Sequence, residues 1–348
     1  MNQTFEAGIK NCVEDCGAVQ RGQIACVVSE EGSADKRVAD ALAERAKDRG
    51  ARVKIIWGPK IPKDQPEKIP ADVLNAYAEA DVLFSHYPSL KREALHPHFP
   101  GEKRTRVPNR ARTVDLMSTR WAAFPYSVQR AMAVTIDTIS APGKSWHITS
   151  PSGTDVRGTF GTPDSTVAQA YFVEEEGGRA RRNFPGGVHS PVMAVATEGI
   201  IIADHIGGFG TMGKTNPIKL ELRDGRVVSI EGGDDEGRML TALSKTDGFI
   251  DSWHAGVNPM TVVPYARVSN PVEWYSYSHC SPMIVHFHVG RSTAPIDAAC
   301  FNQSITIDRR KIYENGQLML WDDPEVEQRI KASNMPADML ENNPIPLV

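Results

Sequence analysis

The chain has 348 residues, of which 24% are charged and 41% hydrophobic, and its formal net charge at pH 7 is -4. These values are typical of a soluble globular protein and show no basic excess that would attract nucleic acid or an anionic membrane surface. Its five cysteines form no CxxC pair, which argues against a zinc ribbon or a disulfide framework. Without a basic leader or an apolar run of membrane-spanning length, we expect a cytoplasmic protein with neither nucleic-acid nor membrane partners.

The N-terminal part alternates short apolar runs with amphipathic segments. We expect strands at 23–30, 52–58 and 81–88 and helices at 30–50 and 70–80, with Ser33 as a possible N-cap. Strand, helix and strand in this order make a βαβ unit, which predicts a parallel sheet. No GxGxxG motif follows the first strand, so a nucleotide cofactor is not indicated. His86 ends the third strand, where open α/β sheets bind ligands, and is a candidate for proton transfer.

The pattern of apolar and turn-forming residues changes near residue 140. Before it, 95–110 is predicted to be a loop, and 117–135 a strand, a turn around Pro125 and a helix. After it, alternating and turn-rich segments predict antiparallel strands, with Asp224-Gly225 and Asn315-Gly316 at hairpin turns. We therefore predict two domains: residues 1–140 as a parallel α/β, Rossmann-like domain, and residues 141–348 as a β-rich α+β catalytic domain.

Three histidines of the second part carry most of the functional signal. Residues 284–289 read IVHFHV, so in a strand His286 and His288 share one face and present two imidazoles side by side. Such a pair suits a metal site or a proton-handling site, although strand histidines also bond to neighbouring carbonyls. His254 lies upstream in SWHAGVNP and is a candidate to join them.

The turn NFPGGVHSP presents a fourth histidine. Two glycines after Pro185 permit a close backbone approach that a Cβ would block, and His189 then stands at the start of a strand. His189 is a candidate acid/base residue, and the alternative is a histidine that caps the turn. Asp204-His205 is a further acid/histidine pair, which can equally cap a strand.

Several segments together carry a family resemblance, and they are listed here in chain order: SGTDVRGTF, NFPGGVHSP, HAGVNP, MIVHFHVGRS and SITIDRRKIYENGQLM. The chain resembles the aminopeptidase T-type metallopeptidases, and more closely their short ring-cleaving branch, the 2,5-dihydroxypyridine 5,6-dioxygenases. The resemblance covers most of the chain from about residue 80 and implies a metal-dependent homo-oligomer.

The sequence departs from this family at most metal positions. His189 follows Val188 where the peptidases have a ligand Glu, and Ser252 falls at or near a second ligand position. The later His-x-Asp pair is placed at Phe301-Asn302-Gln303, and only His286 matches a family histidine.

We therefore expect an enzyme that acts on a small aromatic or N-heterocyclic compound and resembles the ring-cleaving dioxygenases. His254, His286 and His288 would hold a divalent metal, with Fe(II) favoured, and Asp251 or Glu273 can take the third place in a two-histidine, one-carboxylate triad. His189 and His86 would handle protons. The alternatives are a metal-dependent hydrolase of a small amide, lactam or peptide, and a non-catalytic binding protein that has lost the metal site.

Overall fold

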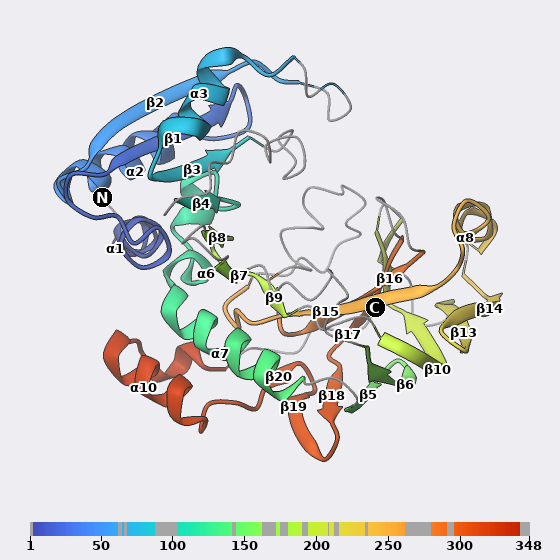
Figure 1. Cartoon of the computed structure of the whole chain (residues 1–348). Helices are drawn as coiled ribbons and strands as arrows, with labels where there is room; N and C mark the ends of the chain where they lie inside the picture. Colours follow the sequence, from blue (N-terminus) through green and yellow to red (C-terminus); the bar gives the residue numbers. More distant parts are fainter. Residues whose placement is uncertain are drawn as a thin grey trace. The chain divides into compact units, whose positions relative to one another are not determined.

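The computed structural model of the chain describes residues 3–61, 65, 68–87, 104–140, 144–161, 172–174, 180–189, 194–207, 209–211, 216–233, 236–261, 280–290 and 296–341 (Figure 1). Its contacts divide the chain into two compact units. Unit 1 comprises residues 1–127 and 171–186, and unit 2 comprises residues 128–170 and 187–348. The division into domains 1–140 and 141–348 stays a prediction.

Unit 1 contains a sheet with the strand order β2-β1-β3-β4-β8-β7. Its strands are β1 (Ile24–Glu30), β2 (Arg52–Gly58), β3 (Val82–His86), β4 (Thr105–Pro108), β7 (Phe172–Glu174) and β8 (Ala180–Arg182). The pairs β1-β2, β1-β3, β3-β4 and β4-β8 are parallel, and β7-β8 is antiparallel. The predicted parallel α/β architecture of the N-terminal part is confirmed.

Helices cover this sheet with the apolar spacing expected from the sequence. In α2 (Lys36–Asp48), Val38, Leu42 and Ala46 are buried at intervals of four residues. The N-cap is Asp35, which accepts a hydrogen bond from the Arg37 amide, so the prediction of Ser33 was wrong. Ser33 lies too early, and its hydroxyl instead bonds to the backbone carbonyls of Glu30 and His86.

The remaining longer helices of the N-terminal half pack on the sheet, pack against other helices, or lead into unit 2. They are α1 (Gln3–Lys10), which continues as a π-helix over Asn11–Cys16, and α3 (Ala71–Glu79), and α7 (Tyr126–Ile139) runs from unit 1 into unit 2. Cys26, Val28 and Leu83 pack with α3 in one buried cluster.

Two further local predictions in this half were wrong. Residues 105–108 form β4 instead of a loop, because Val107 is fully buried and the Arg106 guanidinium, although charged, donates to the carbonyls of Ala80 and Tyr77. The strand expected before Pro125 is replaced by two single-turn helices, α5 (Val114–Met117) and α6 (Arg120–Ala123). Threonine side chains cap both helices, and the sequence reading overlooked these caps.

Unit 2 is built on two antiparallel sheets. The eight-stranded sheet has the order β14-β13-β10-β6-β5-β18-β19-β20, and the six-stranded sheet has the order β12-β11-β17-β16-β15-β9. The strands of the first are β5 (Ser145–Thr149), β6 (Asp155–Phe160), β10 (Ala194–Ala203), β13 (Ile218–Arg223), β14 (Arg226–Glu231), β18 (Ser304–Ile307), β19 (Arg310–Glu314) and β20 (Gln317–Leu318). Those of the second are β9 (Val188–His189), β11 (His205–Ile206), β12 (Gly210–Thr211), β15 (Ile250–Gly256), β16 (Ile284–Val289) and β17 (Ile296–Phe301). The predicted antiparallel β-rich region is confirmed.

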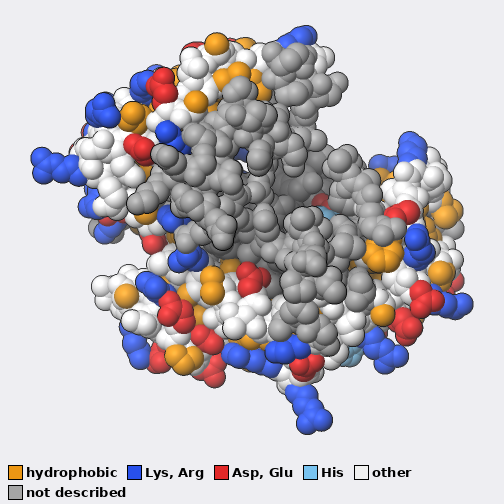
Figure 2. Space-filling model, in the orientation of Figure 1, with side chains coloured by type: hydrophobic (Ala, Val, Ile, Leu, Met, Phe, Trp, Pro, Cys, Tyr) orange, Lys and Arg blue, Asp and Glu red, His pale blue; other side chains and the backbone are white. Residues whose placement is uncertain are grey.

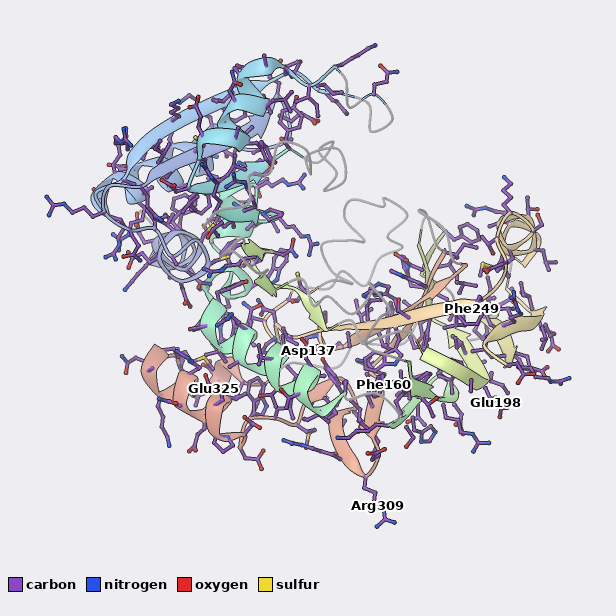
Figure 3. The ribbon with its side chains drawn as sticks, in the orientation of Figure 1. Asp137, Phe160, Glu198, Phe249, Arg309 and Glu325 are labelled. Carbon is purple, nitrogen blue, oxygen red and sulfur yellow. The ribbon has the colours of Figure 1, made fainter. Side chains whose placement is uncertain are left out.

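Turns and helices complete unit 2. Asp224 and Asn315 adopt positive φ angles, each followed by a glycine that does the same, as two-residue hairpins require. Arg309, at the tip between β18 and β19, points away from the sheet (Figure 3). Helix α8 (Glu236–Leu243) follows β14, and α10 (Pro324–Ser333) begins after its N-cap Asp323, which also accepts a hydrogen bond from Thr135 on α7. None of the helices in the described residues is long and apolar enough to cross a membrane.

The core of unit 2 lies between its two sheets. Trp253 of β15 packs edge-on against Trp146 of β5, with 6.2 Å between the ring centroids. Trp253 also contacts Phe160 of β6, which is labelled in Figure 3, with 6.4 Å between the centroids. Trp253 pairs with Phe287 across the sheet, so this face of β15 and β16 belongs to the core. Because side chains alternate along a strand, residues 252, 254, 286 and 288 occupy the opposite face.

Candidate metal centre

Folding brings the three histidines together on one face of the six-stranded sheet. His254 of β15 lies directly opposite His286 of β16, and His288 lies opposite Ser252. Each histidine offers a ligand nitrogen within 4.8 Å of the other two. The His254 ring stacks on that of His286 with centroids 4.9 Å apart and lies 4.1 Å from that of His288. The predicted approach of His254 to the 286/288 strand is confirmed, and the role of the three as metal ligands stays a prediction.

A serine hydroxyl lies between two of these imidazoles. Ser252 Oγ is 2.8 Å from His254 Nε2 and 3.3 Å from His288 Nδ1, and the residue is fully buried. The hydroxyl can accept from one ring and donate to the other, so it holds both nitrogens pointing to the same place. Ser252 stands at or near the position where the resemblance calls for a Glu or His ligand.

A buried carboxylate lies on the other side of His288, and the sequence reading missed it. Asp297 of β17 is paired with His288 in the register, and its Oδ1 lies 3.6 Å from His288 Nε2. Burial lowers the pKa of His288 to about 4, so the ring is neutral at physiological pH and has a lone pair available for a metal. The available signal was an aspartate inside the apolar run IDAACF.

Backbone packing fixes the end of β15 just after His254. A Cβ on Gly256 would lie 2.1 Å from the carbonyl carbon of Cys280, so only glycine allows these two segments to approach. The Asn258 amide donates to the Cys280 carbonyl, and the Tyr313 hydroxyl donates to that of Gly256. The motif HAGVNP therefore anchors β15 against the segment that leads into β16.

His189 enters the same sheet through its backbone. It lies in β9, opposite Ala255, the residue after His254. Its side chain is outside the described residues, as are the side chain of Asp251 and all of Glu273. Their predicted roles stay predictions.

His86 belongs to unit 1, and its side chain is fully buried in a closed network. Its Nδ1 lies 2.9 Å from Ser29 Oγ, and its Nε2 lies 2.9 Å from Asn109 Nδ2. The side-chain oxygen Oδ1 of Asn109 accepts from the Ala111 backbone amide, so the side-chain NH2 group donates to His86 Nε2 and the ring proton resides on Nδ1. Burial, aided by the charge of Arg112, lowers the pKa of His86 to about 3. This environment favours a structural histidine, and the proton-transfer role of His86 stays a prediction.

Asp204 and His205 belong to the same six-stranded sheet. His205 begins β11, and Asp204 is the residue before it. Asp204 accepts hydrogen bonds from the Ser152 hydroxyl and, at 2.8 Å, from the Phe301 amide. Burial raises the pKa of Asp204 to about 6 despite these bonds. The Asp204 carboxylate therefore ties the start of β11 to the end of β17, where His205 lies opposite Ala299.

Comparisons with solved structures agree with this architecture. The chain is similar to a 2,5-dihydroxypyridine dioxygenase from Pseudomonas putida KT2440, with a TM-score of 0.66, 15% identity, and coverage of 92% of this chain and 98% of the other. It is also similar to wild-type AmpT, an aminopeptidase T, from Thermus thermophilus, with a TM-score of 0.57, 15% identity, and coverage of 91% and 99%. No protein-family model matches the sequence, and no curated protein matches it either. These likenesses show a distant relationship of fold.

Proposed function

We propose that the chain is a metal-dependent enzyme of the aminopeptidase T-like group that acts on small aromatic or N-heterocyclic compounds, most closely in the manner of a ring-cleaving dioxygenase. The observation that carries the proposal is the convergence of His254, His286 and His288 from two adjacent strands. The fold it shares with a 2,5-dihydroxypyridine dioxygenase supports the substrate class.

The donor set fits a divalent metal. Nitrogens bound to one ion at about 2.1 Å from the same side lie about 3.0–3.4 Å apart. The ligand atoms of the cluster lie within 4.8 Å of one another, so the widest pair needs to close by at most about 1.8 Å. Neutral imidazoles suit Fe(II), zinc, nickel and copper alike, and Asp297 beside His288 can supply the carboxylate of a facial triad.

Each residue has a task that follows from its contacts. A bound divalent ion supplies Lewis acidity and, if it is iron, redox chemistry with dioxygen. His254, His286 and His288 would hold the ion from one face of the six-stranded sheet. Ser252 orients the rings of His254 and His288, and Asp297 can further orient that of His288 by accepting from its Nε2. His189 is proposed to move protons to or from the substrate.

The decisive experiment combines metal analysis with oxygen uptake. Protein purified without chelator is analysed for metals, and metal-free protein is reloaded anaerobically with Fe(II). We expect one ion per chain and, on adding 2,5-dihydroxypyridine, iron-dependent consumption of dioxygen with loss of the ring absorbance. A chain that binds no metal after reloading would refute the proposal.

A second candidate is a metal-dependent hydrolase of a small amide, lactam or peptide. It is favoured by the three-imidazole set, which also suits zinc, and by the likeness in fold to AmpT. Turnover of an amide by the zinc-loaded protein under nitrogen, with no oxygen uptake by the Fe(II) form, would support the hydrolase.

A further inference from the structure

A basic depression lies on the surface of unit 2, between α8 and Phe209, the residue before β12. Its volume of about 600 Å³ falls within the range of small-molecule sites. Figure 2 shows Lys and Arg side chains on the surface of the part of the molecule where α8 lies. The described residues that line the depression are Phe209, Gly237, Arg238, Thr241, Ala242 and Lys245.

Helical spacing gathers most of these residues on one face of α8. Thr241 and Ala242 follow Arg238 at intervals of three and four residues, so the three side chains lie side by side. Lys245 continues this spacing in the turn after the helix, where its backbone amide donates to the Ala242 carbonyl. Met239 lies off this face and is fully buried, so it fixes the helix to the body of unit 2.

Phe209 positions the arginine of the depression. The guanidinium carbon of Arg238 lies over the Phe209 ring, 4.2 Å from its centroid, which is close enough for a cation–π contact. A guanidinium that contacts a ring through its flat side keeps its N–H donors in its own plane, where they match the oxygens of a carboxylate or a phosphate. The contact therefore orients Arg238 for binding an oxyanion.

The charge of the depression is positive, although the net charge of the whole chain is -4. Among its described lining residues, two are cationic and none is acidic. The Lys245 side chain is exposed, and no described residue bonds to its ammonium group. Two cations around one space, with no acid among the described residues of its walls, attract an anion.

We propose that this depression binds a small organic anion, with a carboxylate or phosphate group at Arg238 and Lys245 and an apolar body against Phe209 and Ala242. The ligand class follows from the chemistry of the walls, which combine cationic donors with an aromatic ring and a methyl group. The site is separate from the metal centre, because none of its described lining residues is one of the three clustered histidines. The proposal therefore stands or falls independently of the proposed function.

The test is isothermal titration calorimetry of the full chain with benzoate, phenyl phosphate and benzamide. The first two probes carry the two kinds of oxyanion on the same ring, and benzamide lacks the charge. We expect the wild type to bind at least one anion more than tenfold more tightly than benzamide, with an affinity that falls as salt is added. Thr241→Glu places a negative charge in the depression and should weaken anion binding more than tenfold, and Lys245→Gln should weaken it several-fold. Lys47→Gln, at an exposed lysine of α2 in unit 1, is the matched control and should bind like the wild type.

The outcomes separate the ligand classes and the alternatives. If the two variants lose affinity for benzoate alone, the ligand is a carboxylate, and if they lose it for phenyl phosphate alone, the ligand is a phosphate. Loss for both probes assigns a site for either oxyanion. A wild type that binds neither anion, or binds benzamide as tightly, would overturn the proposal. Wild-type anion affinity in folded Thr241→Glu, or in Lys245→Gln if the glutamate variant does not fold, would also overturn it and leave the Arg238–Phe209 contact as a structural one.

Discussion

The two buried histidine environments of this protein differ in what surrounds the ring nitrogens. In unit 1, the two nitrogens of His86 are bonded to Ser29 and Asn109, so the ring joins the carboxyl ends of β1 and β3 to the residue after β4. In unit 2, His254 and His288 both direct a nitrogen at one serine hydroxyl, with His286 stacked alongside. The first arrangement uses up the hydrogen-bonding capacity of an imidazole, and the second concentrates several nitrogens at one point.

This difference separates a structural histidine from a candidate ligand better than burial does. His86 and His286 are both fully buried, and burial lowers the pKa of both His86 and His288. Burial therefore keeps imidazoles neutral in both units. Convergence of nitrogens from neighbouring strands is found, among the described residues, at His254, His286 and His288.

The largest expected effect is loss of metal from a ligand variant. His254→Ala should lower Co(II) affinity more than about a hundredfold, beyond the 10–100-fold typical of outer residues that only orient a ligand. His86→Gln, which changes a buried histidine of the other kind, should bind cobalt like the wild type. Equal metal affinity of the two variants, measured by competition with a chromophoric chelator, would contradict the assignment of His254 as a ligand and of His86 as a structural histidine.

The second prediction concerns the backbone contact that fixes β15. Gly256→Ala would place a methyl group 2.1 Å from the Cys280 carbonyl carbon, so the segments must separate. We expect the free energy of unfolding to fall by about 3 kcal/mol, the upper end for overpacking. Gly237→Ala is the matched control, because nothing lies within 4 Å of the added Cβ. In urea titrations, Gly256→Ala should unfold at a much lower urea concentration than Gly237→Ala. Similar midpoints would show that the two segments separate at little cost in stability.

The third prediction sharpens the role of the carboxylate beside the cluster. Asp297→Asn should lower metal affinity about 10–100-fold, because it removes a charge that orients or joins the ligands. Asp155→Asn is the control, since Asp155 also lies next to a histidine, His147, but on the exposed surface. Equal cobalt affinity of the two variants by calorimetry would exclude Asp297 from the centre.

The smallest effect is on stability, and it depends on pH. The pKa of His86 is lowered from about 6.5 to about 3, so between these pH values the unfolded chain binds a proton that the folded chain does not. The contribution of the neutral His86 ring to the free energy of unfolding is complete above pH 6.5. It is lost as the pH falls toward 3, by at most about 1.4 kcal/mol per pH unit.

His86→Gln should therefore be less stable than the wild type by about 1–2 kcal/mol at pH 7, because polar groups of Ser29 and Asn109 lose their partner. The difference should shrink as the pH falls below 6.5. A difference that stays constant from pH 7 to pH 4 in denaturant titrations would mean that His86 is protonated in the folded state.

The errors of the sequence reading have identifiable physical causes. The short strand β4 was hidden by Arg106, because a side chain that is charged in sequence is satisfied by the carbonyls of Ala80 and Tyr77 only after folding. Asp297 was overlooked for a related reason, because no family motif marks it and its proximity to His288 is set by the pairing of β16 with β17. The predicted roles of Asp251 and Glu273 stay predictions.

The sequence by itself determined strands β1, β2 and β3, the parallel and antiparallel regions, the hairpin turns at Asp224 and Asn315, and the common face of His286 and His288. These features depend on periods of two and about four residues and on local turn chemistry, which neighbouring residues specify. Only the tertiary structure decided that His254 lies opposite His286, that Ser252 and Asp297 flank His288, and that His86 is enclosed by Ser29 and Asn109. These contacts depend on strand order and register, and a shift of one residue would move each side chain to the other face of its sheet.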